Sequence, residues 1–337
     1  MPHPIKTGIL SYGMSGKLFQ APFLSAHNGF DLVATVERSG QKMHLDYPGI
    51  KSYASVDELI ADPSLELVVV NTPSYTHYDY AFKALQAGKH VLIEKPFTVT
   101  AAQAEMLFKE AQERGVHVLP YQNRRFDSDY LSVKEVLESG KLGRIVEAYF
   151  RYDRYQYAIG PKAFKETPMP GSGLLYDLGP HTLDAVFSLF GLPLRWEKST
   201  GHIRPDTQVD DYAHIHLWYP NDMHIFVTLN MTMVGPLPGF IINGTKGNYI
   251  KYRVDTQQQQ LQKSMKPNDP LYGIEEPGKE GALITINNDG TIQHTKIAPV
   301  QSSYIKLFQA VYDTIRSGTP YFITKEQVLK QLEILEG

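Results

Sequence analysis

The stretch Thr7-Gly8-Ile9-Leu10-Ser11-Tyr12-Gly13-Met14-Ser15-Gly16, near the start of the chain, decides the fold. An apolar run leads into a turn, and a helical pattern follows it. In the usual phosphate-binding turn, glycines at the first, third and sixth positions permit the tight turn, the approach of backbone to pyrophosphate and the helix packing. Ser11 replaces the first glycine, whereas Gly13 and Gly16 remain. The stretch therefore predicts dinucleotide binding, with an ordinary glycine-containing turn as the alternative.

The remainder of the first third alternates short β-rich runs with helical stretches. Such near-continuous apolar strands, separated by helices, are typical of a parallel sheet covered on both faces, so we expect a doubly wound nucleotide-binding domain. The further strands expected are 31–36, 65–71, 90–94 and 116–121, and the helices are 17–27, 55–61, 78–87 and 101–114.

The pattern changes after about Tyr121, where longer strands replace the alternation. We therefore expect two domains, 1–121 and 122–337, the second an α/β domain with an open, mostly antiparallel sheet. A helix over 181–190 is one candidate cover for that sheet. The other elements expected are a helix over 129–138, a long strand opening at 145–150, strands over 212–218 and 225–231, and a strand-turn-strand unit over 240–252.

Composition excludes several classes of protein. The chain of 337 residues has no cysteine, so disulfide scaffolds, cysteine metal sites and thiol nucleophiles are impossible. Its net charge of -3 and the lack of basic runs argue against nucleic-acid binding. No secretory signal or apolar membrane span is evident, so we expect a cytoplasmic protein. His214 and His216 share a strand face with no third ligand evident, so we expect no metal site.

The end of the second strand bears on the choice of cofactor. Glu37 would hydrogen-bond the adenosine ribose of NAD and repel a 2′-phosphate, whereas Arg38 and Ser39 would hold the phosphate of NADP. Both kinds of residue are present, so this site leaves the two cofactors open. The alternative is that one of the two side chains, Glu37 or Arg38, simply points to solvent.

Polar residues follow the third long strand at the edge where ligands bind in such sheets. Asn71-Thr72-Pro73 suits a loop over the cofactor, and His77 could line the same crevice, although an isolated histidine here is more often a surface or capping residue. The cofactor-binding candidates are Ser11, Gly13, Met14, Ser15, Gly16, Glu37, Arg38, Ser39, Asn71, Thr72, Pro73, His77, Glu94 and Lys95.

Two short motifs suggest acid–base chemistry. In Glu94-Lys95-Pro96, the proline favours an extended Lys95, whose charge could stabilise a developing alkoxide; a solvent-exposed lysine is the alternative. In Asp177-Leu178-Gly179-Pro180-His181, Pro180 predicts the first turn of a helix, with Asp177 just before it and able to orient His181. A capping aspartate and a core histidine are the alternative there.

In order and spacing, these motifs resemble the Gfo/Idh/MocA oxidoreductases over nearly the whole chain. Within that family, 121–127 and 171–181 most resemble the NADP-dependent scyllo-inositol dehydrogenases. The motifs that carry the resemblance are 12–19 with Ala21-Pro22, Asn71-Thr72-Pro73, 87–91, Glu94-Lys95-Pro96, Lys141-Leu142-Gly143 and 177–181.

The resemblance implies a Rossmann domain followed by an α/β domain, with the substrate between them. It implies catalytic roles for Lys95, Asp177 and His181, substrate contacts from Asn123, Arg125, Arg154, Tyr155, Asp177 and His181, and a homodimer or larger assembly. Ser11 departs from the glycine that the family's phosphate-binding turn has at this position. Of all the family's properties, the identity of the sugar substrate is the one that the resemblance carries over least. We expect a dehydrogenase of a cyclic polyol or sugar that uses NADP, with NAD as the alternative cofactor. A non-catalytic redox or sugar sensor and a reductase of non-sugar carbonyls are the alternatives.

Overall fold

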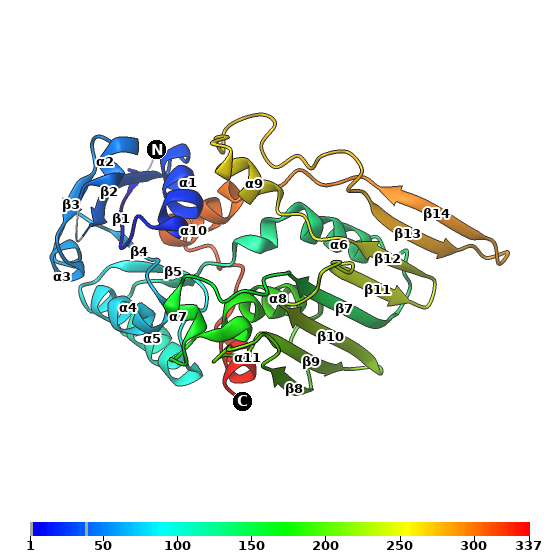
Figure 1. The fold of residues 1–337 in the computed structure, drawn as a ribbon. Coiled ribbons are helices and arrows are strands. Elements are labelled where there is room, and N and C mark those ends of the chain that lie inside the picture. The colour runs from blue at the N-terminus through cyan, green and yellow to red at the C-terminus, as the bar shows by residue number, and fades with distance from the viewer. Residues whose placement is uncertain (1–2, 38–39) are drawn as a thin grey trace. The chain divides into compact units, whose positions relative to one another are not determined.

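The computed structural model describes residues 3–37 and 40–337, which form two compact units (Figure 1). The first unit contains the chain up to residue 123 together with 258–272 and 303–332; the second contains 124–257, 273–302 and 333–337. Two C-terminal segments that we expected within a domain of 122–337 therefore belong to the first unit.

Aromatic packing explains why the late segment 303–332 joins the first unit. Phe308, on α10 (Ile305–Ser317), stacks on Phe23 with ring centroids 5.7 Å apart and meets Phe30 edge-on at 6.1 Å. All three rings are almost completely buried. Removing this much apolar surface from water holds α10 against the early part of the chain.

The first unit is built on a six-stranded parallel sheet in the order β3-β2-β1-β4-β5-β6. This order confirms the predicted doubly wound Rossmann sheet, in which the carboxyl ends of the strands share one edge. The strands are β1 (Ile5–Ile9), β2 (Phe30–Val36), β3 (Lys51–Tyr53), β4 (Leu67–Val70), β5 (His90–Ile93) and β6 (Val118–Pro120).

Local signals set both ends of α5 (Ala101–Arg114). A capping box between Thr100 and Gln103 starts α5, and Gly115, with φ 67°, ends it in the left-handed conformation. The single helix expected over 17–27 is instead a π-helical turn, η1 (Gly16–Gln20), followed by α1 (Ala21–Ala26). The others are α2 (Lys42–Asp46), α3 (Val56–Ile60), η2 (Ser74–Thr76) and α4 (His77–Gln86).

The second unit has an eight-stranded sheet in the order β14-β13-β12-β11-β7-β10-β9-β8. All neighbouring strands are antiparallel except β7 and β10, which confirms the predicted open, mostly antiparallel sheet. The strands are β7 (Ile145–Asp153), β8 (Arg195–Gly201), β9 (Tyr212–Tyr219), β10 (Met223–Asn230), β11 (Phe240–Gly244), β12 (Gly247–Lys251), β13 (Gly281–Ile286) and β14 (Ile292–Ile297).

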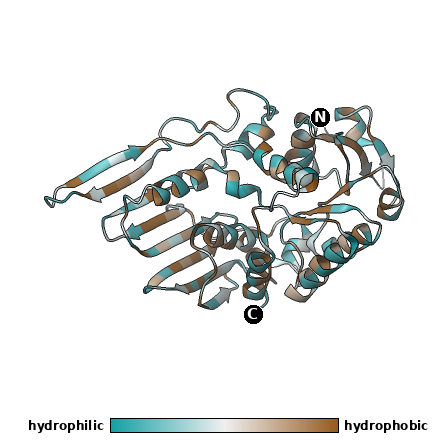
Figure 2. Cartoon of the chain, turned by 180° about the vertical axis from the view of Figure 1, so that it is seen from behind, coloured by the Kyte–Doolittle hydropathy of each residue, from teal (hydrophilic) through white to brown (hydrophobic). Residues whose placement is uncertain are grey.

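Helix α8 (Gly173–Phe190) packs on β7, β9 and β10 (Figure 1). Hydrophobic and hydrophilic residues alternate along the strands of this sheet (Figure 2), as expected when one face is covered. The remaining helices of the chain are η3 (Asn123–Phe126), α6 (Ser128–Glu138), α7 (Ala163–Glu166), α9 (Thr256–Gln262) and α11 (Lys325–Glu336); most of α9 and α11 belongs to the first unit.

The start of α8 corrects one prediction. We expected the helix to begin at Pro180, but it begins at Gly173, and Pro180 lies inside it. Two N–H groups of its first turn find partners outside the helix: the amide of Leu174 donates to the carbonyl of Asp210 at 2.9 Å, and that of Leu175 to its carboxylate at 2.6 Å. A distant side chain thus caps the helix, and Asp177 and His181 lie within it.

No helix in the ranges 3–37 and 40–337 is both long and apolar enough to cross a membrane.

Candidate functional site

The phosphate loop follows β1 and turns back on itself. The Ser11 hydroxyl accepts a hydrogen bond from the amide of Gly13 at 3.2 Å, so serine closes the turn that glycine usually makes. A Cβ on Gly16 would lie 2.1 Å from the Ser11 carbonyl oxygen, much closer than any real contact. Gly16 therefore permits the close packing of helix against strand that the sequence pattern predicts.

Glu94, just after β5, ties the phosphate loop to the end of that strand, which is separated from β1 by β4. Its Oε1 accepts from the Ser15 hydroxyl at 2.5 Å and from Gln20 Nε2 at 2.8 Å. Gln20 was not among the predicted site residues, because nothing in its sequence context points to Glu94. These bonds hold the loop in shape, while Met14 stands exposed beside them.

The loop and its surroundings fit a dinucleotide. A Cβ on Gly13 would meet only the Ser11 hydroxyl at 3.4 Å, so the loop backbone is open to a ligand there. Asn71 donates from Nδ2 to the Ser11 carbonyl at 2.8 Å, and its Oδ1 is buried with no hydrogen-bond partner among the residues that the structure describes. A bound cofactor could satisfy that oxygen, since buried polar atoms are rarely left without a partner.

Glu37 uses both carboxylate oxygens within the fold. Oε1 accepts from the amide of Met43 at 3.1 Å and Oε2 from the Ser52 hydroxyl at 2.9 Å. The carboxylate thereby joins α2 to β3. Arg38 and Ser39, the predicted partners of a 2′-phosphate, lie outside the described residues.

His77 ties together the loops that follow β4 and β5. Its ring is 1% exposed, and its two nitrogens lie 2.8 Å from the carbonyl oxygens of Thr72 and of Pro96. Burial lowers the pKa of His77, so the neutral ring donates to one carbonyl at a time. Thr72 and Pro73 are held from the other side, where the Thr76 hydroxyl lies 2.6 Å from the Thr72 hydroxyl and from the Pro73 carbonyl oxygen.

Lys95 follows β5 at the same sheet edge as the phosphate loop. Its amide donates to Glu94 Oε2 at 3.3 Å, and the peptide bond to Pro96 is cis. The structure thus brings Lys95 together with Ser15, Asn71 and His77 at one end of the parallel sheet, as the strand order requires.

Asp177 and His181 lie on α8, four residues apart and therefore on one face. We expected the aspartate to orient the imidazole. Two cations lie beside its carboxylate: Lys165 Nζ donates to Oδ1 at 2.6 Å, and Arg154 Nη1 lies 4.0 Å from Oδ2. The orienting role of Asp177 stays a prediction. Lys165 was missed because it lies on a separate element, α7, and no motif marks it.

The predicted substrate residues occupy different surroundings. Arg125 forms a two-pronged ion pair with Asp184 on α8, with both bonds at 2.8 Å and both side chains buried. Asn123, just before it on η3, is buried as well. The Arg154 guanidinium lies 4.9 Å from the centre of the Tyr152 ring, and Tyr155 is exposed. Arg125 thus anchors α8, whereas Arg154 lies beside Asp177.

Burial raises the pKa of Asp184, and the Arg125 guanidinium opposes that shift. The pair holds α8 one turn beyond His181.

Two other features of the second unit lie apart from these residues. His216 Nε2 is 2.9 Å from His224 Nδ1, and His214 Nδ1 is 3.1 Å from the Thr228 hydroxyl. Among the described residues no group of three or more His, Cys, Asp or Glu could hold a metal ion.

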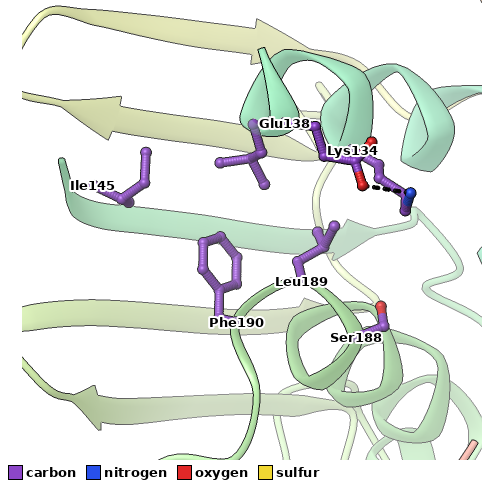
Figure 3. Close-up of a pocket in the computed structure, with 7 residues that line it drawn as sticks. Lys134, Glu138, Ile145, Ser188, Leu189 and Phe190 are labelled. Atoms are coloured by element: carbon purple, nitrogen blue, oxygen red, sulfur yellow. Dashed lines mark hydrogen bonds and ion pairs between the residues drawn. The ribbon is translucent and has the colours of Figure 1, made fainter. Parts of the chain in front are cut away.

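Figure 3 shows a small pocket of about 290 Å³ where α6, β7 and the end of α8 meet. Lys134 and Glu138 form an ion pair at 2.6 Å on its rim. The predicted site residues do not line it; its lining is Lys134, Leu137, Glu138, Ile145, Ser188, Leu189 and Phe190.

Two family descriptions match the chain. "Oxidoreductase family, NAD-binding Rossmann fold" covers residues 5–122, and "GFO/IDH/MocA C-terminal domain" covers residues 130–250.

Similar proteins align over almost the full chain. The uncharacterized oxidoreductase C115.03 of Schizosaccharomyces pombe is 38% identical, over 99% of this chain and 96% of its own. The scyllo-inositol 2-dehydrogenase (NADP(+)) IolW of Bacillus subtilis is 33% identical, over 99% of this chain and 92% of its own. A crystal structure of an oxidoreductase from Bacillus cereus superposes with a TM-score of 0.90 at 32% identity, covering 98% of this chain and 95% of that one.

Proposed function

The chain belongs to the Gfo/Idh/MocA family of NAD(P)-binding oxidoreductases, and from that premise we propose that it is a dehydrogenase of cyclic polyols or sugars. Hydride would pass between a nicotinamide and a carbon that bears a secondary hydroxyl or, in reverse, a ketone. The similarity to a scyllo-inositol 2-dehydrogenase supports an inositol-like substrate.

The observation that carries the proposal is the placement of a carboxylate and an imidazole one turn apart on the same face of α8. Acid–base catalysis of alcohol oxidation needs a group that takes the hydroxyl proton and a charge that stabilises the group once it is protonated. His181 and Asp177 supply these two functions. Lys95, which follows β5 of the parallel sheet, supplies a positive charge for the substrate oxygen that loses its proton.

In the oxidation direction, the substrate hydroxyl gives its proton to a ring nitrogen of His181 as the carbon loses hydride. The Asp177 carboxylate stabilises the imidazolium that forms, and the Lys95 ammonium stabilises the alkoxide-like oxygen. The nicotinamide, when bound, supplies the hydride acceptor. In reduction, His181 returns the proton to the oxygen. Ser11, Gly13, Ser15, Gly16 and Asn71 would hold the cofactor.

A substrate panel tests this function. Inositols, aldoses and simple carbonyl compounds are offered with each cofactor, and turnover is followed by the absorbance of the reduced nicotinamide. We expect turnover with a cyclic polyol or sugar. Tight dinucleotide binding with no turnover on any compound would contradict the proposal and favour the sensor alternative, and turnover of simple carbonyls alone would favour the reductase alternative.

For the cofactor we propose NADP, with NAD as the second choice. The carboxylate of Glu37 already serves Met43 and Ser52, which leaves Arg38 and Ser39 as the residues suited to a 2′-phosphate.

We expect Arg38→Ala to weaken NADP binding about 10- to 100-fold, the loss of one charge-assisted contact, while NAD binding changes little. Titration of both cofactors by fluorescence measures the two dissociation constants. Lys42→Ala, which removes an exposed cation four residues further on, is the control and should leave their ratio unchanged. An equal loss for both cofactors would disprove the assignment of Arg38.

We propose that the protein forms a homodimer through the face of the larger sheet opposite α8. Phe150, on the covered face, meets Phe190 of α8 edge-on at 6.1 Å, so its neighbour Tyr149 points away from the helix. Tyr149 pairs with Phe226 and with Ile241, which in turn pairs with Ile250, so an apolar row crosses the opposite face. A second copy could bury this row.

Light scattering after size exclusion is expected to give at least a dimer for the wild type, and Phe226→Glu should shift it toward a monomer by placing a charge in the apolar row. Glu113→Gln, at an exposed position on α5 outside this sheet, is the control. A wild type that elutes as a clean monomer would refute the dimer.

A further inference from the structure

A buried arginine fixes the segment 156–166, which follows β7 and ends in α7. Arg204 Nη2 donates to Glu166 Oε2 at 2.9 Å, and its Nε donates to Asp211 Oδ2 at 3.1 Å. Its Nη1 also lies 3.4 Å from the carbonyl oxygens of Gln156 and Ala158. Because the planar guanidinium presents its donors in a fixed fork, one buried side chain holds both ends of the segment.

Lys165 precedes Glu166, so the same anchor determines where its side chain can reach. Its Nζ donates to Asp177 Oδ1 at 2.6 Å, and the Lys165 and Asp177 side chains are 36% and 18% exposed. Arg154 faces the other oxygen of this carboxylate at 4.0 Å. Two cations from separate elements thus bracket Asp177.

We infer that Lys165 is a positioning residue for the reaction, acting through Asp177, and that Arg204 holds it in place. The inference rests on the proposed function, in which Asp177 serves the proton transfer at His181. A carboxylate held by one short charge-assisted bond keeps one orientation, so the oxygens of Asp177 stay aligned with the imidazolium of His181 that they stabilise.

A purely structural ion pair would behave differently. Pairs that solvent still reaches contribute little to stability, because solvent screens them. Replacing Lys165 should therefore leave the melting temperature almost unchanged and still lower turnover, which separates a positioning role from a structural one.

The decisive experiment is a double-mutant cycle in the full-length protein with the best substrate of the panel. Lys165→Met is expected to lower kcat about 10-fold or more, with Lys165→Arg restoring most of it and the cofactor dissociation constant unchanged. In the Asp177→Asn background, Lys165→Met should have no further effect, because the carboxylate through which it acts is gone.

The control for this cycle is Lys162→Met, which removes a lysine from an exposed position in the same segment and should retain wild-type kcat. Equal factors for Lys165→Met in the wild-type and Asp177→Asn backgrounds would overturn the inference, since Lys165 would then act independently of Asp177. Wild-type kcat in Lys165→Met would overturn it too.

A second measurement needs no substrate. Acylation of lysines by a water-soluble reagent, read by peptide mass spectrometry, should modify Lys165 more slowly in the wild type than in Asp177→Asn, because the bond to Asp177 holds the amine away from the reagent. The rate at Lys162 should be the same in both proteins. Equal rates at Lys165 in both proteins would overturn the inference.

The two measurements distinguish the failures. Failure of the whole substrate panel would disprove the proposed function, and the positioning role with it, even if Lys165 reacts slowly. Turnover that needs His181 but not Lys165 would leave the function standing and remove Lys165 from it.

Discussion

Replacing His181 with alanine is expected to lower turnover about 10²- to 10⁴-fold, the range for losing a positioned acid–base group. The hydroxyl proton would then have no acceptor on the protein at the moment when hydride leaves carbon. Lys95→Met should lower turnover by a similar order, because the alkoxide-like oxygen loses its cation. Initial rates with saturating cofactor measure both effects.

Cofactor affinity distinguishes lost chemistry from lost structure. The dissociation constant for the cofactor and the melting temperature of both variants should stay close to those of the wild type. His202→Ala, which removes an exposed histidine of the second unit, serves as the matched control with wild-type turnover. Unchanged kcat in purified His181→Ala or Lys95→Met would refute the catalytic assignment of that residue.

Gly16→Ala is expected to destabilise the protein by about 3 kcal/mol and to abolish measurable cofactor binding. The added Cβ would lie 2.1 Å from the Ser11 carbonyl oxygen and 3.1 Å from its carbon, and this neighbour is backbone that cannot rotate away. The phosphate loop must therefore shift from the strand end. Denaturant unfolding of the protein without cofactor measures the stability.

Gly13→Ala is the matched comparison in the same loop. Its Cβ would make only an ordinary contact of 3.4 Å with the Ser11 hydroxyl, so unfolding without cofactor should match the wild type. Cofactor affinity should still fall, because the methyl group would stand where the pyrophosphate approaches the backbone. Equal stability of the Gly16→Ala and Gly13→Ala proteins would contradict the close packing seen at Gly16.

Elements marked by local chemistry could be predicted closely from the sequence. The helix expected at 101–114 is α5 (Ala101–Arg114), because the cap at Thr100 and the stop at Gly115 are both written in neighbouring residues. Five of the six strands of the parallel sheet could be found for a similar reason, since each is a short apolar run, whereas the edge strand β3, Lys51-Ser52-Tyr53, has no such run and was missed. Their order then places Ser15, Asn71 and Lys95 at one edge.

Tertiary partners decided what local patterns could not. Pro180 resembles a helix start, yet α8 begins at Gly173 because Asp210, from a separate part of the chain, accepts from its first amides. The packing of α10 against Phe23 joins distant parts of the chain, and no local pattern specifies it.

The candidate site divides in the same way. The phosphate turn depends on backbone geometry that a few consecutive residues specify. Asp177 and His181, in contrast, share a helix face because α8 begins at Gly173, where Asp210 accepts from its first amides. The ion pair between Lys165 and Asp177, like the anchoring of Arg125 on Asp184, depends on which distant charges the folded chain brings within reach. Periodicity is local and can be predicted, whereas the pairing of buried charges is a property of the completed packing.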